Sequence, residues 1–537
     1  MATNAAVSRN DRPAADGDAP AESDDADRGP LGLVVLAGAI AAAVLTPLLW
    51  VLLAVVDVGP DALALLTRPG TIAVLLNSAA MVVAVTGLSV ALAVPLAFLT
   101  ARTDLPFRRL WTVAISLPLV IPSYIGAFAF VSAFGANGIL ARTLGIAWLP
   151  AVDGFPGVVF VLTLYTYPYV FIATRAALKT MDTRLIDAAR TLGDSRWKAF
   201  RRVTVPAIGP AIAAGALLVA LYALSDFGTP SIMGVDVLTR VIYVELNAFG
   251  RDLAAVLSLQ LVAITLVILA LESRVRARSP SGGGSRHTSI VRLGRWRWPA
   301  LALPAGVSLL GLAVPIGVLV GWLVGSEAGA GALELDTVLN SVVVAGATAL
   351  AAAACCLPIA YLAASHRSRL AAAFERATYV GYAMPGVVLG LALVFFGSRY
   401  LPSVYQTLPL LVFAYVVRFL PQAVGSTRAA FVRVDGRLPG AARTLGDGPL
   451  RSFRRVTLPL IAPGLLAGAA LVFLTTMKEL PATLMLRPTG FETLVTRVWQ
   501  AESAGYFGQA AVPALVLVFV SALSMLVLLS QEGYDGR

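Results

Sequence analysis

The chain has 537 residues, of which 58% are hydrophobic and only 13% are charged, and its formal net charge is +11. Soluble domains carry about 25% charged residues, so this composition excludes an ordinary soluble globular protein. Most of the 41 lysines and arginines lie in alternate loops between apolar segments. The positive charge therefore indicates the inner side of a membrane, and it argues against a nucleic-acid partner.

Apolar segments of about 20 residues, long enough to cross a hydrocarbon core, recur along the whole chain. In chain order, the predicted spans of the first half are 31–56, 71–101, 110–134, 155–177, 206–224 and 254–271. Those of the second half are 298–324, 338–364, 377–396, 408–424, 459–476 and 511–530. We therefore predict an all-α integral membrane protein with about twelve transmembrane helices.

Two polar segments separate these spans into units. Residues 1–30 are rich in Ala, Asp and Ser and predict a disordered tail with no cleaved signal peptide. Residues 273–297 contain Ser-Gly-Gly-Gly-Ser and seven arginines, which is typical of a flexible linker. We expect six spans in each of the flanking units, 31–272 and 298–537, and the positive charge places the linker and both termini in the cytoplasm.

The two units are copies of each other. Residues 187–212 read DAARTLGDSRWKAFRRVTVPAIGPAI, and residues 440–465 read GAARTLGDGPLRSFRRVTLPLIAPGL. The same offset of 253 pairs Asp226 with Glu479, while an offset of 263 pairs the Asn-Ser at 77–78 with that at 340–341. Because six spans separate equivalent points, the repeat is parallel, with a pseudo-two-fold axis along the membrane normal.

The repeated segment lies on the inner side, between spans. Its apolar and basic residues predict two short amphipathic pieces, broken in each copy by a glycine. A short helix of this kind suits a groove on a partner protein. A helix lying on inner-leaflet lipid is the alternative, although lipid binding would not require such close repetition of Gly, Leu and Pro.

This segment resembles the hallmark inner loop of the membrane subunits of binding-protein-dependent ATP-binding cassette importers of the type I fold. That loop runs Glu-Ala-Ala, three residues, Gly, and then Ile-x-Leu-Pro. The matching residues are Asp187, Ala188, Ala189, Gly193 and Pro206 in the first copy, and Gly440, Ala441, Ala442, Gly446 and Pro459 in the second. Neither copy keeps the leading Glu, so the resemblance does not carry over an ion pair made by that residue.

The resemblance implies a permease whose two loops dock on two copies of a separate ATPase subunit, and whose cargo comes from an extracytoplasmic binding protein. The three lysines, Lys179, Lys198 and Lys478, lie outside any G-x-x-x-x-G-K-[ST] loop, so we expect ATP hydrolysis on the partner. No catalytic constellation or metal-ligand cluster stands out in the sequence, and we expect no cofactor. The partners are then these two proteins and the lipid bilayer.

The cargo is indicated by less specific residues. The KELPAT at 478–483 and the LRPTGF at 486–491 are similar to the corresponding stretch of ferric-iron permeases, and the SDFG at 225–228 fits the same group. Ferric iron is the preferred cargo, with thiamine, polyamine, sulfate and phosphonate as alternatives. An ion-driven secondary transporter is the alternative class, but it would not need a duplicated docking loop.

Asp226 and Glu479 follow the prolines that begin their spans by about 20 residues, which places them near the outer edge of the hydrocarbon. Carboxylates are suitable hard ligands for a trivalent cation, so these two residues and Lys478 are candidates for the translocation path. Alternatively, the carboxylates are solvated or paired, for instance with Lys478. Arg418, inside the tenth predicted span, is interpreted as reaching an interface or an internal carboxylate.

Overall fold

The computed structural model of the protein describes residues 30–135, 138–145, 148–248, 250–277, 290–325, 334–366 and 368–532. Regular secondary structure in these ranges is helical, apart from one isolated bridge between Thr103 and Val291. The predicted tail, except Pro30, and residues 278–289 of the predicted linker lie outside the described residues.

The first half contains long helices joined by short ones. In order they are α1 (Leu31–Val58), α2 (Asp61–Leu66), α3 (Pro69–Arg102), α4 (Arg108–Ser116), η1 (Leu117–Val120), α5 (Ser123–Ala133), α6 (Ile139–Leu144), α7 (Gly154–Thr180), α8 (Arg184–Thr191), α9 (Arg196–Ala199), η2 (Phe200–Thr204), α10 (Val205–Ser225), α11 (Gly228–Ile232), α12 (Leu238–Asn247) and α13 (Arg251–Ala277).

The second half repeats this order with small differences at its start. Its helices are η3 (Gly294–Arg297), η4 (Pro299–Leu301), α14 (Ala302–Ser308), η5 (Leu309–Ala313), α15 (Val314–Gly325), α16 (Leu335–Ser365), α17 (Arg369–Ala383), α18 (Gly386–Tyr400), α19 (Leu408–Arg433), α20 (Arg437–Thr444), α21 (Pro449–Ser452), η6 (Phe453–Thr457), α22 (Leu458–Met477), α23 (Pro481–Leu486), α24 (Leu494–Ser503) and α25 (Phe507–Glu532).

Nine helices among the described residues are long and apolar enough to cross a membrane, or up to 11 when each of two bent pairs counts as one span. The twelfth predicted span, 511–530, lies within α25. The bent pairs correct the prediction of straight, unbroken spans at 110–134 and 377–396. The first pair bends by 92° between η1 and α5, and the second bends by 98° between α17 and α18. Pro122 and Pro385 stand at these breaks, where a residue without a backbone N–H cannot continue the helix.

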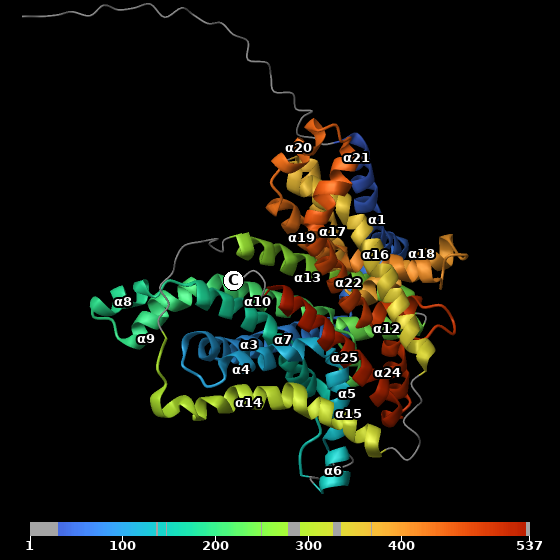
Figure 1. Ribbon diagram of the computed structural model, residues 1–537. Helices are drawn as coiled ribbons and strands as arrows, with labels where there is room; N and C mark the ends of the chain where they lie inside the picture. The colour runs from blue at the N-terminus through green and yellow to red at the C-terminus, as the bar shows by residue number, and fades with distance from the viewer. Residues whose placement is uncertain are drawn as a thin grey trace, which may run out of the picture.

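The first helix of each half packs against the opposite half (Figure 1). Helix α1 contacts α16, α17 and α18, and its Trp50 ring lies 4.7 Å from Phe396 and 4.9 Å from Tyr400 between ring centroids. In the other direction, η5 and α15 lie along η1 and α5, and Trp322 Nε1 donates to Ser132 Oγ at 3.3 Å. The halves are therefore interlocked, and their apolar cores are shared.

Candidate functional site

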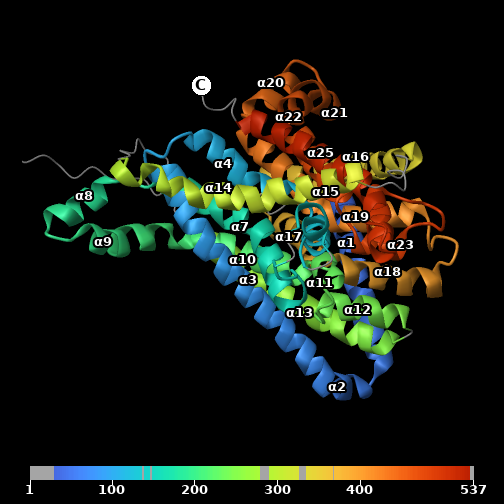
Figure 2. The same cartoon turned by 90° about the horizontal axis from the view of Figure 1, so that it is seen from below.

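In each half, the repeated inner loop forms short helices that project from the body of the protein (Figures 1 and 2). Helix α8 is followed by α9 and the π-helical turn η2, and α20 is followed by α21 and η6. Gly193 and Gly446 lie between the pieces, with φ of 92° and 95°. At both glycines the break predicted from the sequence is present, and a side chain there would be strained.

The hydrogen bonds at the two breaks are the same. The N–H of Gly193 donates to the carbonyl of Arg190 at 3.1 Å, and the next N–H, of Asp194, donates to Ala189 at 3.1 Å. The second loop repeats this pattern from Gly446 and Asp447, also at 3.1 Å. This is the Schellman arrangement, which satisfies the last carbonyls of a helix and requires a left-handed residue.

Each loop exposes large apolar side chains at equivalent positions. Leu192 and Trp197 are 87% and 70% exposed, and their counterparts Leu445 and Leu450 are 88% and 70% exposed. Most other residues that match the family motif are also at the surface: Asp187, Ala188, Pro206, Gly440, Ala441 and Pro459 are exposed, while Ala189 and Ala442 are half-buried. Exposed apolar residues gathered in this way are typical of an interaction surface.

The candidate path residues of the two halves line one cavity of ≈ 270 Å³, which we call the chamber. Asp226 follows the end of α10, and Lys478 and Glu479 follow the end of α22. The two segments approach each other, because a Cβ atom added to Gly228 would lie 3.4 Å from Leu480 Cδ2. Other polar residues that line the chamber are Ser123, Tyr124, Tyr169, Tyr222, Ser225, Tyr382, Arg418, Gln422 and Thr475.

Glu479 is almost completely buried and has several donors. Its Oε1 atom accepts from Arg418 Nη1 at 2.7 Å, and its Oε2 atom accepts from the backbone N–H groups of Ala482 at 3.0 Å and Thr483 at 3.3 Å. The side chain of Glu479 is 2% exposed, against 18% for Arg418. The interpretation that Arg418 reaches an internal carboxylate is therefore confirmed.

Lys478 does not pair with Glu479, which excludes that alternative from the sequence analysis. Its Nζ atom makes one long contact, 3.5 Å, to the carbonyl of Leu119. Within the described residues no ion pair is formed by Lys478. The pairing falls to Arg418 because α19 carries this guanidinium to the wall of the chamber, beside the end of α22.

Asp226 has different partners from its counterpart. Its carboxylate accepts a hydrogen bond from Ser123 Oγ and another from the backbone N–H of Thr229 at 2.9 Å. The hydroxyl of Tyr222 donates to Ser123 Oγ at 3.3 Å, so a neutral chain of hydroxyls supports this carboxylate. Both carboxylate oxygens of Asp226 thus have a hydrogen-bond donor, and neither donor is a cation.

Ser123 and Gly386 are functional positions that the sequence reasoning missed. Gly386 lies 263 residues after Ser123, at the equivalent position. A Cβ atom added to Gly386 would collide with both Arg418 Nη1 and Glu479 Oε1. Glycine therefore makes room for the ion pair in the second half. The alignment of the two repeats could have indicated this difference, because it places Ser123 opposite Gly386.

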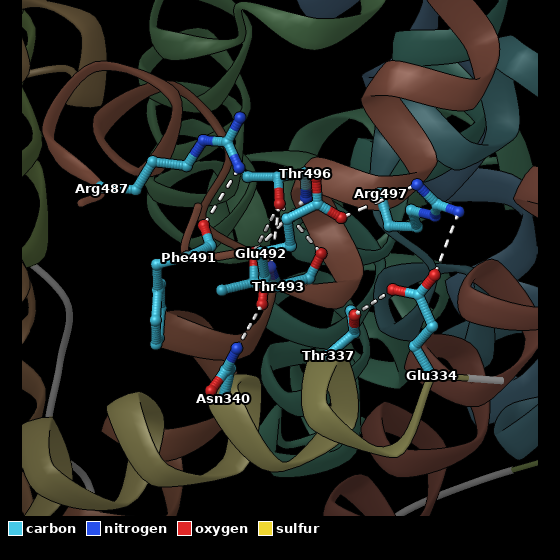
Figure 3. Close-up of polar contacts among 9 residues, drawn as sticks. All are labelled: Glu334, Thr337, Asn340, Arg487, Phe491, Glu492, Thr493, Thr496 and Arg497. Atoms are coloured by element: carbon cyan, nitrogen blue, oxygen red, sulfur yellow. Dashed lines mark hydrogen bonds and ion pairs between the residues drawn. The ribbon is translucent and has the colours of Figure 1, made fainter. Parts of the chain in front are cut away.

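The segments that follow the two carboxylates are clamped by the repeated Asn-Ser pair. Asn340 Nδ2 donates to the carbonyl of Glu492 at 3.0 Å, and the N–H of Leu494 donates to Ser341 Oγ at 2.8 Å. Figure 3 shows the bond from Asn340 to Glu492 together with Arg497, which reaches Glu334 at 3.4 Å and Glu492 at 3.7 Å.

The first half has the same clamp in a simpler form. Asn77 Nδ2 donates to the carbonyl of Asp236 at 3.2 Å, and the N–H of Leu238 donates to Ser78 Oγ at 2.9 Å. Arg240 pairs with Asp236, four residues before it in the same segment. The clamps therefore hold both segments against the N-terminal parts of α3 and α16.

Comparison with known proteins agrees with the division of the chain into two repeated halves. Residues 93–277 and 356–533 each match the family described as binding-protein-dependent transport system inner membrane component. The chain is 32% identical to the Fe(3+)-transport system permease protein FbpB 2 of Haemophilus influenzae, over 93% of this chain and 98% of that protein.

Two further relatives cover different shares of the chain. The probable ABC transporter permease protein y4fN of Sinorhizobium fredii is 26% identical over 94% of this chain and 95% of its own length. The molybdenum transport system permease protein ModB of Mycobacterium tuberculosis is 33% identical over 42% of this chain and 85% of its own length. The chain belongs to the inner membrane components of binding-protein-dependent transport systems: it is the permease subunit of an ATP-binding cassette importer, with the family domain twice in one polypeptide and with ATP hydrolysis on a separate subunit.

Proposed function

We propose that this permease imports ferric iron, which an extracytoplasmic binding protein releases at the outer face. The observation that carries the proposal is the similarity to an Fe(3+)-transport permease along 98% of that relative's length. The similarity to a molybdenum permease covers 42% of the chain, so it reflects one repeat and favours that cargo less.

The chamber is the proposed path through the protein. Asp226, Glu479 and Lys478 line it, and charged groups at such depth are functional candidates by default. Asp226 is the better candidate for contact with cargo, because its side-chain partner is a neutral hydroxyl that the cargo can displace. Glu479 is held by Arg418 and two backbone amides, so we assign it the role of positioning Arg418 and the loop that follows.

The two inner loops are the proposed docking sites for two copies of the ATPase subunit. The proposed contacts are Asp187, Ala188, Ala189, Gly193 and Pro206 in one loop, and Gly440, Ala441, Ala442, Gly446 and Pro459 in the other. Two exposed, nearly identical surfaces on one chain suit a partner that is itself a symmetric pair. Closure of that pair would then move both halves together.

The rest of the topology follows from this docking. We propose that residues 1–30 are a cytoplasmic tail, that 31–272 and 298–537 are the two permease halves, and that 273–297 is a cytoplasmic linker. Both termini would then face the cytoplasm, on the same side as the loops. The concentration of Lys and Arg in these segments supports this orientation.

Uptake of radiolabelled iron by a strain that lacks the chromosomal permease gene tests the cargo. We expect Asp226→Asn to lower iron uptake at least about tenfold, which is the effect of losing one charged hydrogen bond. Asp61→Asn, the same change at an exposed residue of α2, is the matched control and should leave uptake unchanged.

Two results would contradict these proposals. If wild type restores uptake of thiamine or sulfate but not of iron, the cargo is wrong. If Asp226→Asn combined with Glu479→Gln leaves iron uptake intact while the chain is inserted normally, the assignment of these residues to the path is wrong.

A further inference from the structure

Lys478 is a half-buried cation that forms no ion pair within the described residues. It lines the chamber, and its only contact within hydrogen-bonding distance among the described residues is the carbonyl of Leu119 at 3.5 Å. A charged group taken out of water is costly unless it is paired. The equivalent residue of the first half is Ser225, so this charge is a specific addition to one side of the chamber.

The other polar groups around Lys478 also offer donors. Tyr169 and Tyr382 line the chamber, and no described residue accepts a hydrogen bond from either hydroxyl. Gln422 accepts from Thr475 Oγ1 at 3.1 Å through its amide oxygen, which leaves its NH₂ group to donate. These groups can donate hydrogen bonds that no described residue accepts.

The carboxylates that a bare metal ion would need already have hydrogen-bond or ion-pair partners. Glu479 accepts from Arg418 and two backbone amides, and Asp226 accepts from Ser123 and Thr229. The described residues contain no group of three or more His, Cys, Asp or Glu side chains placed to hold a metal ion. Arg418 and Lys478 also cancel the formal charge of the two carboxylates, so the chamber has no net attraction for a trivalent cation.

We propose that the chamber binds a small oxyanion at Lys478, and that ferric iron passes through it as a complex whose outer atoms are anionic oxygens. The identity of the metal rests on the proposed function, whereas the anion site does not. A cavity of ≈ 270 Å³ has room for a metal ion with several oxygen ligands, since a water takes about 30 Å³ of the liquid. The hydroxyls and Lys478 donate to the oxygens of this complex.

The experiment uses the complete transporter in liposomes, with the permease, its ATPase subunit and the binding protein loaded with radiolabelled iron. Labelled phosphate is supplied with the iron in one series and labelled citrate in another. We expect one of these anions to enter with the iron in comparable molar amount. Lys478→Gln should lower the entry of both labels about 10- to 100-fold, because a charged hydrogen bond is lost.

Two variants separate charge in the chamber from charge in general. Lys478→Arg keeps the cation and should retain more uptake than Lys478→Gln. Lys179→Gln removes the same charge from the exposed inner end of α7 and should match wild type. Recovery of the ATPase subunit with each purified permease shows that the variant is folded.

The outcomes distinguish the two proposals. Iron that enters wild type without either anion, at a rate that Lys478→Gln does not change, overturns the anion site and leaves iron import standing. An anion that enters without iron supports the anion site and overturns the cargo. If neither labelled iron nor a labelled anion enters while the binding protein still stimulates ATP hydrolysis, both the anion site and the iron cargo are overturned.

A second measurement does not depend on transport. The chain has three lysines, so modification by an amine-specific reagent can be followed at each one by mass spectrometry. Added phosphate or citrate should slow the modification of Lys478 and leave that of Lys179 unchanged. Equal rates at Lys478 with and without both anions would contradict the proposal.

Discussion

The two halves of the permease hold equivalent carboxylates with different donors: a neutral hydroxyl in the first half and a guanidinium in the second. Asp226 and Glu479 occupy equivalent positions after equivalent helices, yet Asp226 is held by Ser123 and Glu479 by Arg418. The position of Arg418 corresponds to Tyr165 in the first half, and that of Ser123 to Gly386 in the second. In the second half Arg418 supplies the donor and Gly386 leaves room for it, whereas in the first half Ser123 supplies the donor itself.

The two inner loops differ from the chamber, because they keep the same glycine break and the same pattern of ion pairs. Asp194 contacts Lys198 at 2.7 Å and Arg202 at 3.8 Å, and Asp447 contacts Arg451 at 3.8 Å and Arg455 at 3.6 Å, at equivalent positions. A fused chain allows each half to change alone, which two identical subunits cannot do. The loops remained alike because, in our proposal, both meet the same partner, whereas the chamber was free to become asymmetric.

The largest effect should come from breaking the ion pair of the second half. Arg418→Met leaves the carboxylate of Glu479 buried with no cation, so we expect a loss of about 3–5 kcal/mol of stability. Thermal unfolding of the purified permease in detergent measures this loss. The double variant Arg418→Met with Glu479→Gln should recover part of it, and a double variant no more stable than the single one would contradict the assigned pairing.

The next effect concerns the loops. Gly446→Val places a β-branched residue at a φ of 95°, which costs about 1–2 kcal/mol and distorts the break between α20 and α21. We expect the ATPase subunit to copurify about tenfold less well, because a loss of about 1.4 kcal/mol lowers a binding constant tenfold.

Gly448→Ala is the matched control for this loop. Gly448 has a φ of −65°, and a Cβ atom added there would meet no atom within 4 Å. Copurification should therefore be unchanged. If Gly446→Val also leaves binding and coupled ATP hydrolysis intact, the loop is not a docking site.

These comparisons also show what sequence can predict. The spans and the repeat were predictable because hydrophobic length and identity are local properties. The exchange of α1 and α15 between halves was not, since a lipid-facing and a protein-facing side chain are both apolar and hydropathy does not encode the partner. The pairing of Arg418 with Glu479 joins α19 to the segment after α22, and residues so far apart in the sequence give no local signal of contact. The one hint in the sequence is that the repeat aligns Ser123 with Gly386.

A smaller effect is expected in the first half, where the donor is neutral. Ser123→Ala removes one hydroxyl from Asp226, which keeps the N–H of Thr229 and can be reached by water from the chamber. We expect a loss of about 1 kcal/mol, well below that of Arg418→Met. The same unfolding assay compares them, and equal losses would mean that the two carboxylates are held in the same way.

The smallest effect should separate the two outer clamps. Asn77→Ala and Asn340→Ala each remove one hydrogen bond to a backbone carbonyl, worth about 0.5–1.5 kcal/mol. Helix α24, which follows the second of these segments, is also tied to the start of α16 by Arg497 and Glu334, whereas Arg240 makes only a local pair with Asp236. Hydrogen exchange should therefore rise more in residues 234–237 after Asn77→Ala than in residues 490–493 after Asn340→Ala. Equal increases would show that the pair of Arg497 with Glu334 adds nothing, as is common for exposed ion pairs. In that case Asn340→Ala combined with Arg497→Gln should exchange no faster than Asn340→Ala alone.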